Sequence, residues 1–340
     1  MKVSRVSMFL RGKVFQMIAL TAVVLIIAAI NTPQMFNIYN IRQLLLNITI
    51  AGIFICGVSP LLMSGGIDFA GTAIGNCGAV AFAMLFVNNV GTPWWVWVVP
   101  ALIIGGLMGA INAFFVIKLN MMAFIATMAM ASIWQALVTW LVKSVAIPIP
   151  AGPFTRLSAV FVFDTIPLFF IVMIVLVFIY SVILIKTSFG RSVLMCGGNA
   201  SAARLAGLKP NKVRTILFIN SGVVAALGGM VRASQTRLGS HMTLSGLQPH
   251  MSAFIASILG GVSFFGGSGS LAGGFFGVAL INTLSYSLLA MGVDVWVNGL
   301  INGSLLIIAL TIDDVSRRMR MRRLGIKAGS NNLTMPGMSR

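Results

Sequence analysis

Few residues of this 340-residue chain could do proton or ion chemistry, because its acids number five, all of them aspartates. Asp68 is the best placed, since it follows Gly65 and Gly66 at the end of a long apolar run. An ionisable residue in such a place often serves as a proton or ion relay. The more ordinary alternative is that Asp68 caps the start of a helix.

Groups for covalent or metal chemistry are sparse. The sequence has no nucleotide-binding G-x-x-x-x-G-K-[ST] loop, no H-E-x-x-H motif and no paired carboxylates. Its three cysteines form no C-x-x-C pair, and we expect its two histidines, His241 and His250, to be solvated loop residues. We therefore predict no enzyme activity, no metal site and no cofactor bound by this chain.

Uncharged amides instead recur within the apolar runs. An amide both donates and accepts hydrogen bonds without the cost of burying a charge, so amides along a pathway suit a neutral, hydroxyl-rich solute. The alternative is hydrogen bonding between helices, worth about 0.6–2 kcal/mol per contact. The candidates for a solute pathway are Asn47, Asn76, Asn112 and Asn282.

The composition indicates the kind of protein that must position these residues. Charged residues make up 8% and hydrophobic residues 58%, whereas an ordinary soluble protein has about 25% charged residues. So few charges could not cover the surface of a soluble domain. The net charge of +18 alone would suggest nucleic acid, but the basic residues cluster between apolar runs, as cytoplasmic loops of membrane proteins do. We therefore expect membrane lipid, and not nucleic acid, around this chain.

Runs of ~20 apolar residues are needed to cross a bilayer. We predict an all-α, polytopic membrane protein with about ten transmembrane helices (eight to ten) and with broken or re-entrant Gly-rich segments. Small residues four positions apart, such as Gly105 and Gly109, predict close packing of these helices. One run, 250–265, is short and could belong to a broken element. The predicted spans are 14–30, 44–63, 73–90, 95–117, 121–142, 166–185, 213–231, 250–265, 271–290 and 295–312.

The basic residues also predict the orientation. With the N-terminus inside and the spans alternating, 18 of the 23 lysines and arginines fall on the inner side. Both termini are then cytoplasmic. The chain divides into a membrane domain over 1–315, which includes a long inner segment at 186–212, and a basic cytoplasmic tail over 316–340.

The inner segment 186–212 contains the signals for a short helix. Asn199 is a natural N-cap, Gly207 suits the left-handed position that follows a helix, and Pro210 prevents any continuation. A helix of about two turns is not stable by itself in water. It must therefore dock, either on its own membrane domain or on an external partner.

Three motifs in the same order give the chain a resemblance to a known family. Ser64-Gly65-Gly66-Ile67-Asp68, and then residues 187–207, resemble the GGIDLSVGS motif and the cytoplasmic coupling segment of the ribose/xylose/galactose-type ABC importer permeases. The second Gly-rich motif of that family resembles Gly260-Gly261 with Gly267, Gly269 and Gly273. The likeness covers most of residues 40–315.

This resemblance implies a membrane-spanning subunit of a sugar importer in the bacterial inner membrane. It would pair with a second copy or a paralogue, with cytoplasmic ATPase subunits that bind ATP and Mg, and with a periplasmic solute-binding protein. Gly65, Gly66, Asp68 and the second Gly-rich motif would then serve gating. The residues that would couple to the ATPase are Gly198, Asn199, Ala202, Ala203, Arg204, Leu205 and Gly207.

The sequence departs from the family pattern at three places. Gln248 and His250 stand where the family usually has acids before the second Gly-rich motif. Phe69-Ala70-Gly71-Thr72 replaces Leu-Ser-Val-Gly after Asp68, and Ala200-Ser201 stands where the coupling helix usually has acids. These departures leave the coupling role intact and the solute open. The alternatives are a permease for branched-chain amino acids or nucleosides, and a self-sufficient carrier or channel that uses Asp68.

Overall fold

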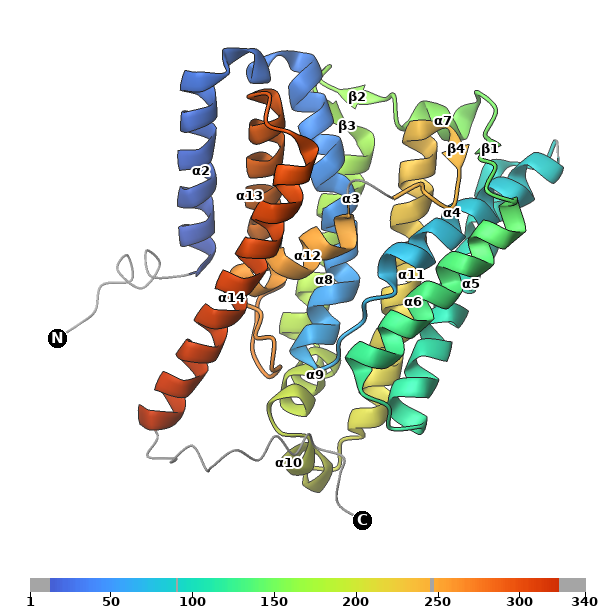
Figure 1. Ribbon diagram of the computed structural model, residues 1–340. Helices are drawn as coiled ribbons and strands as arrows, with labels where there is room; N and C mark the ends of the chain where they lie inside the picture. Colours follow the sequence, from blue (N-terminus) through green and yellow to red (C-terminus); the bar gives the residue numbers. More distant parts are fainter. Residues whose placement is uncertain (1–12, 90, 245–247, 324–340) are drawn as a thin grey trace.

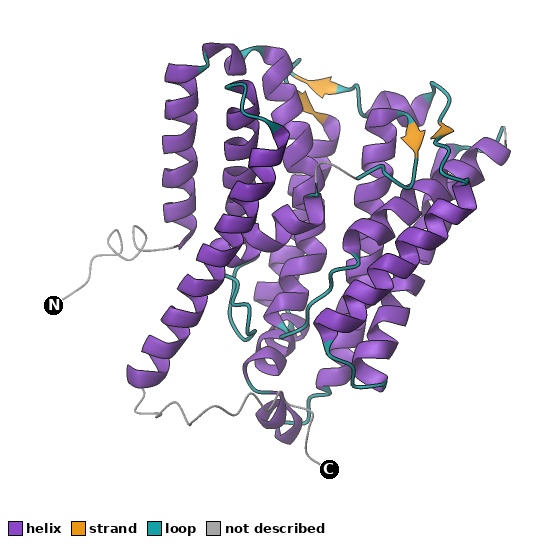
Figure 2. Ribbon diagram, in the orientation of Figure 1, coloured by secondary structure: helices purple, strands orange, loops and turns teal. Residues whose placement is uncertain are grey.

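The computed structural model describes residues 13–89, 91–244 and 248–323, which form a bundle of helices with hardly any sheet (Figures 1 and 2). The long helices are α2 (Lys13–Asn31), α3 (Ile38–Met63), α4 (Gly71–Asn88), α5 (Trp94–Ala113), α6 (Ala123–Val142), α8 (Leu168–Lys186), α11 (Pro210–Thr236), α13 (Leu271–Ala290) and α14 (Val295–Arg323). A 3-10 turn, Pro33–Phe36, follows α2, and a π-turn, Phe114–Lys118, continues α5.

The remaining elements are short. The helices are α7 (Pro153–Leu157), α9 (Ser188–Gly198), α10 (Ala200–Leu205) and α12 (Pro249–Leu259). Two antiparallel pairs of two-residue strands are β1 (Ile147–Pro148) with β4 (Leu238–Gly239), and β2 (Phe161–Val162) with β3 (Ile166–Pro167).

The described part of the chain contains eight helices that are long and apolar enough to cross a membrane, namely α2, α3, α4, α5 with its π-turn, α6, α8, α11 and α13. The prediction of an all-α, polytopic membrane protein is thereby confirmed. The run 250–265 is not one helix, because α12 has eleven residues and spans only about 16 Å. Helix α14 continues past residue 315 to Arg323, and the rest of the predicted tail lies outside the described residues.

The two faces of the bundle differ in what they carry. Helices α9 and α10 project from the lower face in Figure 1, on the same side as the start of α2 and the end of α14. Helix α7 and the two strand pairs lie at the opposite, upper face (Figure 2). Helix α12 lies at mid-height within the bundle, as expected for a broken crossing (Figure 1).

The interior of the bundle is built around α3, which is buried from Ile48 to Met63 and packs against α8, α11, α12 and α13. The peripheral helices instead expose large apolar side chains. Ile26 on α2 is 60% exposed and Phe178 on α8 is 67% exposed. Water would make such a surface unfavourable, whereas lipid tails solvate it, so these helices face the bilayer.

Several helices touch backbone to backbone at glycines. A Cβ on Gly222 of α11 would lie 2.1 Å from the carbonyl oxygen of Gly105 on α5, and a Cβ on Gly109 would lie 2.3 Å from that of Phe218. Gly229 of α11 approaches Gly75 of α4 in the same way. The predicted close packing at the small residues is confirmed for α5 against α11.

Candidate functional site

A buried carboxylate lies where the chain crosses the bundle between α3 and α4. Asp68 is 3% exposed and belongs to the non-helical segment that precedes α4. Its Oδ1 accepts hydrogen bonds from the Ala70 backbone N–H (3.0 Å) and from Asn112 Nδ2 (3.3 Å), and its Oδ2 accepts one from Ser221 Oγ (3.0 Å). Neutral donors from α5 and α11 therefore surround the carboxylate on both oxygens.

The backbone around Asp68 is bonded to two further helices. The Phe69 N–H donates to Thr127 Oγ1 of α6 at 3.1 Å, and His250 Nε2 of α12 donates to the Asp68 carbonyl oxygen at 2.7 Å. Trp134 of α6 donates to Asn112 Oδ1 at 3.1 Å. Residues of α5, α6, α11 and α12 thus meet at Asp68, and we call this group the Asp68 cluster.

The expectation that His250 is a solvated loop residue is wrong. His250 is 1% exposed because it follows Pro249 at the start of α12, inside the bundle. Its Nδ1 faces Gly71, where an added Cβ would lie 2.2 Å away. Nε2 donates to a carbonyl oxygen, whereas Nδ1 has no hydrogen-bond partner in the described part of the chain.

A second set of amides holds the chain segment that follows β4. Asn76 Nδ2 of α4 and Gln135 Nε2 of α6 each donate to the His241 carbonyl oxygen at 2.8 Å. The Leu244 backbone N–H donates to Asn76 Oδ1 at 2.9 Å. The amides fix this segment against α4 and α6.

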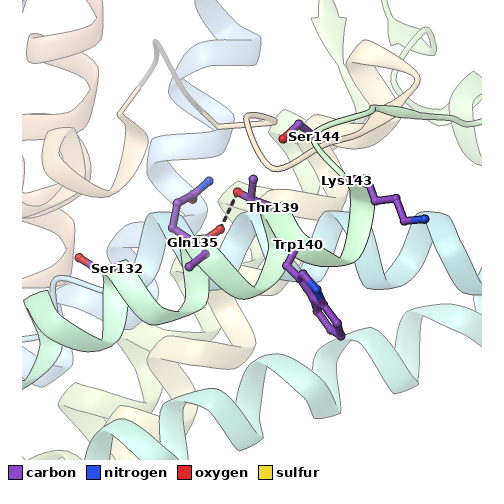
Figure 3. Close-up of a pocket in the computed structure, with 7 residues that line it drawn as sticks. Ser132, Gln135, Thr139, Trp140, Lys143 and Ser144 are labelled. Atoms are coloured by element: carbon purple, nitrogen blue, oxygen red, sulfur yellow. Dashed lines mark hydrogen bonds between the residues drawn. The ribbon is translucent and has the colours of Figure 1, made fainter.

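An open depression lies along one side of α6 toward the upper face (Figure 3). Its volume is about 800 Å³, and polar side chains recur along it at helical spacing. The Thr139 and Ser132 hydroxyls donate to the carbonyl oxygens of Gln135 and Met128 on the same helix. The lining residues are Ser132, Gln135, Ala136, Thr139, Trp140, Lys143 and Ser144.

The four candidate pathway amides do not form one group. Asn76 and Asn112 are buried and bonded between helices, Asn282 donates to the Val278 carbonyl oxygen of its own helix, and Asn47 is half-buried on α3. Within the part of the chain that the structure describes, no hydrogen bond joins two of them. Their common role as a solute pathway stays a prediction.

The predicted Gly-rich motifs meet at the lower end of the bundle, together with α9. The Gly267 backbone N–H donates to the Met63 carbonyl oxygen at 2.9 Å. A Cβ on Gly197 would lie 1.9 Å from that same oxygen, and a Cβ on Gly266 would lie 2.8 Å from the Gly65 nitrogen. We call the backbone contacts among Met63, Gly65, Gly197, Gly266 and Gly267 the glycine junction.

The second Gly-rich motif also packs closely on itself. A Cβ on Gly273 would lie 2.1 Å from the Gly260 carbonyl oxygen, so the end of α12 touches the start of α13. Gly261 and Gly269 have φ angles of 99° and 158°, a region that favours glycine. Gly66 is enclosed differently, since its added Cβ would meet Leu61 of its own chain segment at 2.7 Å.

The short helix predicted from Asn199 to Gly207 is confirmed as α10. Asn199 Oδ1 accepts from the Ser201 and Ala202 backbone N–H groups at 3.0 Å, and Gly207 has a φ of 81°. Its two faces differ sharply, since Ala203 is 2% exposed and Leu205 is 92% exposed. The helix thus docks on its own protein through one face and presents the other to the outside.

The cysteine beside α10 is enclosed. Cys196 on α9 is fully buried, and burial raises the pKa of its thiol although the nearby Arg214 guanidinium acts in the opposite direction. The thiol is therefore protonated at neutral pH and is a poor nucleophile.

These features define a polytopic, α-helical membrane protein with broken helices that meet at its centre, an arrangement typical of transporters. Residues 40–310 match the family described as branched-chain amino acid transport system / permease component. The chain belongs to this family.

Individual relatives cover nearly the whole chain. The L-arabinose transport system permease protein AraH of Escherichia coli K12 is 29% identical over 306 residues, which is 90% of this chain and 92% of AraH. The ribose import permease protein RbsC of Bacillus subtilis 168 is 29% identical over 86% of this chain and 89% of RbsC. The autoinducer 2 import system permease protein LsrC of Yersinia enterocolitica is 29% identical over 85% and 80%. No solved structure matches the chain.

Proposed function

We propose that this chain is the membrane-spanning subunit of an ABC importer for a sugar or a similar small polar solute. Family membership supports the transport role, and two of the relatives are named for the monosaccharides arabinose and ribose. A periplasmic solute-binding protein would deliver the solute. ATP and Mg would be held by a separate ATPase, since the sequence has no P-loop.

The exposed face of α10 is the observation that carries this proposal. An exposed leucine at the tip of a capped two-turn helix has no stabilising role in the isolated chain, because it is 92% in solvent. A partner surface would bury it together with the neighbouring Arg204. We assign this face to the ATPase, with Gly198, Asn199 and Ala202 shaping the helix and Ala203 anchoring it.

The proposed topology has ten crossings and both termini in the cytoplasm. The start of α2 is the lower end of that helix, and α10 and the end of α14 also lie toward the lower side, which would be cytoplasmic (Figure 1). Helices α4 and α12, together with the non-helical segments beside them, would each make one crossing. We place the protein in the bacterial inner membrane, as a multi-pass subunit that pairs with a second copy or a paralogue.

The depression on α6 is our candidate wall of the solute pathway. It is polar at Gln135 and Thr139 although it lies on a membrane-spanning helix, and it is open on one side (Figure 3). A second permease subunit would close it. Hydroxyl and amide groups suit a solute that both donates and accepts hydrogen bonds.

A second candidate solute is a branched-chain amino acid, which the family description names. The self-sufficient carrier has less support. The carboxylate of Asp68 already accepts three hydrogen bonds from neutral donors, and no ion pair of Asp68 occurs in the described part of the chain. This arrangement favours a structural role for Asp68.

Affinity purification of the tagged chain from membranes tests the proposal. We expect an ATPase and a solute-binding protein to copurify, and Leu205→Asp to lose the ATPase while the chain still inserts normally. Phe163→Asp is the matched control, because Phe163 is also exposed (89%) but lies in the β2–β3 turn at the upper face. An equal yield of copurified ATPase from the wild type, Leu205→Asp and Phe163→Asp would contradict the assignment of α10 to the ATPase contact.

A further inference from the structure

We propose that the coupling segment moves both broken helices together through the glycine junction, with Gly197 and Arg214 as its positioning residues. The inference rests on the proposed function and extends it, since it names the path from α10 into the membrane. Its basis is the set of contacts on either side of α10.

The contact before α10 is made by backbone alone. Gly197, in the last turn of α9, lies so close to the end of α3 that an added Cβ would be 1.9 Å from the Met63 carbonyl oxygen and 2.6 Å from the Gly267 nitrogen. Gly267, in turn, donates its N–H to Met63. Three segments that are distant in sequence therefore touch without any side chain between them.

The contact after α10 is made by a charged side chain. Arg214, in the second turn of α11, donates Nε to the Ser64 carbonyl oxygen at 3.1 Å. Met63 and Ser64 are adjacent, so the two flanks of α10 contact consecutive carbonyl groups at the end of α3, Gly197 by packing and Arg214 by a hydrogen bond. A displacement of α10 would therefore act on α3 from both sides.

Two segments of the chain lead from the glycine junction into the interior of the bundle. One is the non-helical segment from Gly66 to Ala70, which ends at the Asp68 cluster and extends about 15 Å when stretched. The other is the loop after α12, where Ser263 Oγ and the Phe264 N–H donate to Asp313 Oδ2 of α14 at 3.2 and 3.0 Å. Motion at α10 would reach α4 through the first segment. It would reach α12, α13 and α14 through the second segment.

The physical reason for assigning a relay to the contact before α10 is the absence of side chains at that contact. Close-packed interfaces shift between discrete arrangements and do not deform continuously. Flexible side chains can absorb a displacement by changing rotamer, whereas backbone in contact with backbone must move with it. Gly197, Gly266 and Gly267 are needed here because an added Cβ at each would lie 1.9–2.8 Å from the backbone of a neighbouring segment. Gly65 is favoured for a different reason, its φ of 76°.

The test compares two glycine-to-alanine variants in the complex with the copurified ATPase. Gly197→Ala would force the segments apart by roughly 1 Å, since carbon and oxygen need more than 3 Å. Gly299→Ala, on α14, adds the same methyl where the space around it is open. The measured quantity is the amount of solute taken up per ATP hydrolysed.

We expect Gly197→Ala to lower the ratio of solute taken up to ATP hydrolysed at least about fivefold, the lower end of usual coupling between sites, and Gly299→Ala to leave it unchanged. If Gly197→Ala does not fold, Arg214→Met removes the second contact and should lower the same ratio, with Arg214→Lys partly restoring it. A proportional loss of uptake and hydrolysis, or an unchanged ratio in both Gly197→Ala and Arg214→Met, would overturn the relay. Failure of the wild-type complex to couple uptake to ATP would instead overturn the proposed function.

Discussion

The Asp68 cluster allows the structural and the ion-relay roles of Asp68 to be separated by two substitutions. Asp68→Ala leaves three buried donors without an acceptor, namely the Ala70 N–H, Asn112 Nδ2 and Ser221 Oγ. Hydrogen bonds inside membrane bundles are worth about 0.6–1.7 kcal/mol each. We therefore expect Asp68→Ala to lower the free energy of unfolding by about 2–5 kcal/mol in total.

Asp68→Asn keeps the shape of the side chain and removes only its charge. The amide oxygen can accept from the Ala70 N–H and from Asn112, and the amide nitrogen can donate to Ser221 after that hydroxyl rotates. Hydrogen bonds to a neutral acceptor are weaker than those to a carboxylate. We therefore expect Asp68→Asn to lower the free energy of unfolding by about 1 kcal/mol. Transport should survive, because in this account Asp68 carries no ion.

The assay has two parts, unfolding of the purified protein in a detergent titration and uptake in cells that lack the native copy. Asp164→Asn is the control, since Asp164 is exposed in a turn with positive φ that asparagine also favours. Equal free energies of unfolding for Asp68→Ala and Asp68→Asn would refute the claim that the three hydrogen bonds to Asp68 stabilise the fold. A stable Asp68→Asn protein without transport would refute the structural role and favour the ion relay.

Three further predictions concern helix packing at Gly222, the amide of Gln135 and the thiol of Cys196. Gly222→Val would meet the Gly105 carbonyl oxygen and should abolish monodisperse protein, whereas Gly303→Ala, with open space around it, should not. Gln135→Ala removes one of two bonds to the His241 carbonyl oxygen, and the segment after β4 should then be cut faster by protease in membrane vesicles with that face exposed. Cys196 should resist alkylation until the protein is denatured, and its raised pKa means that folding loses stability as the pH rises above the ordinary thiol value of 9.0. Rapid native labelling at pH 7 would contradict the burial of Cys196.

Local sequence signals predicted the helices well, because hydropathy over ~20 residues is set by the bilayer itself. The predicted span 271–290 coincides with α13, and 14–30 falls within one residue of α2 at each end. The cap at Asn199 and the left-handed Gly207 were also predictable, since both depend on neighbours within one helical turn. The helix α9 was not predicted, because its basic and glycine-containing sequence has no strong signal.

Contacts between distant segments could not be predicted from the sequence. Gly197 is an ordinary glycine until α9 is packed against Met63 and Gly267, and Arg214 is counted only as one more inner-side cation until it bonds Ser64. His250 was expected in solvent because it lies beside a predicted external loop. The structure buries it by placing α12 halfway into the bundle.

The central claim is that this protein moves solute only when a separate ATPase drives it. The most direct measurement is solute uptake into vesicles that contain the purified chain, with and without the copurified ATPase and solute-binding protein. We expect uptake only from the complete assembly with ATP, and none from the chain alone under a proton or sodium gradient. Accumulation of solute by the chain alone would contradict the account.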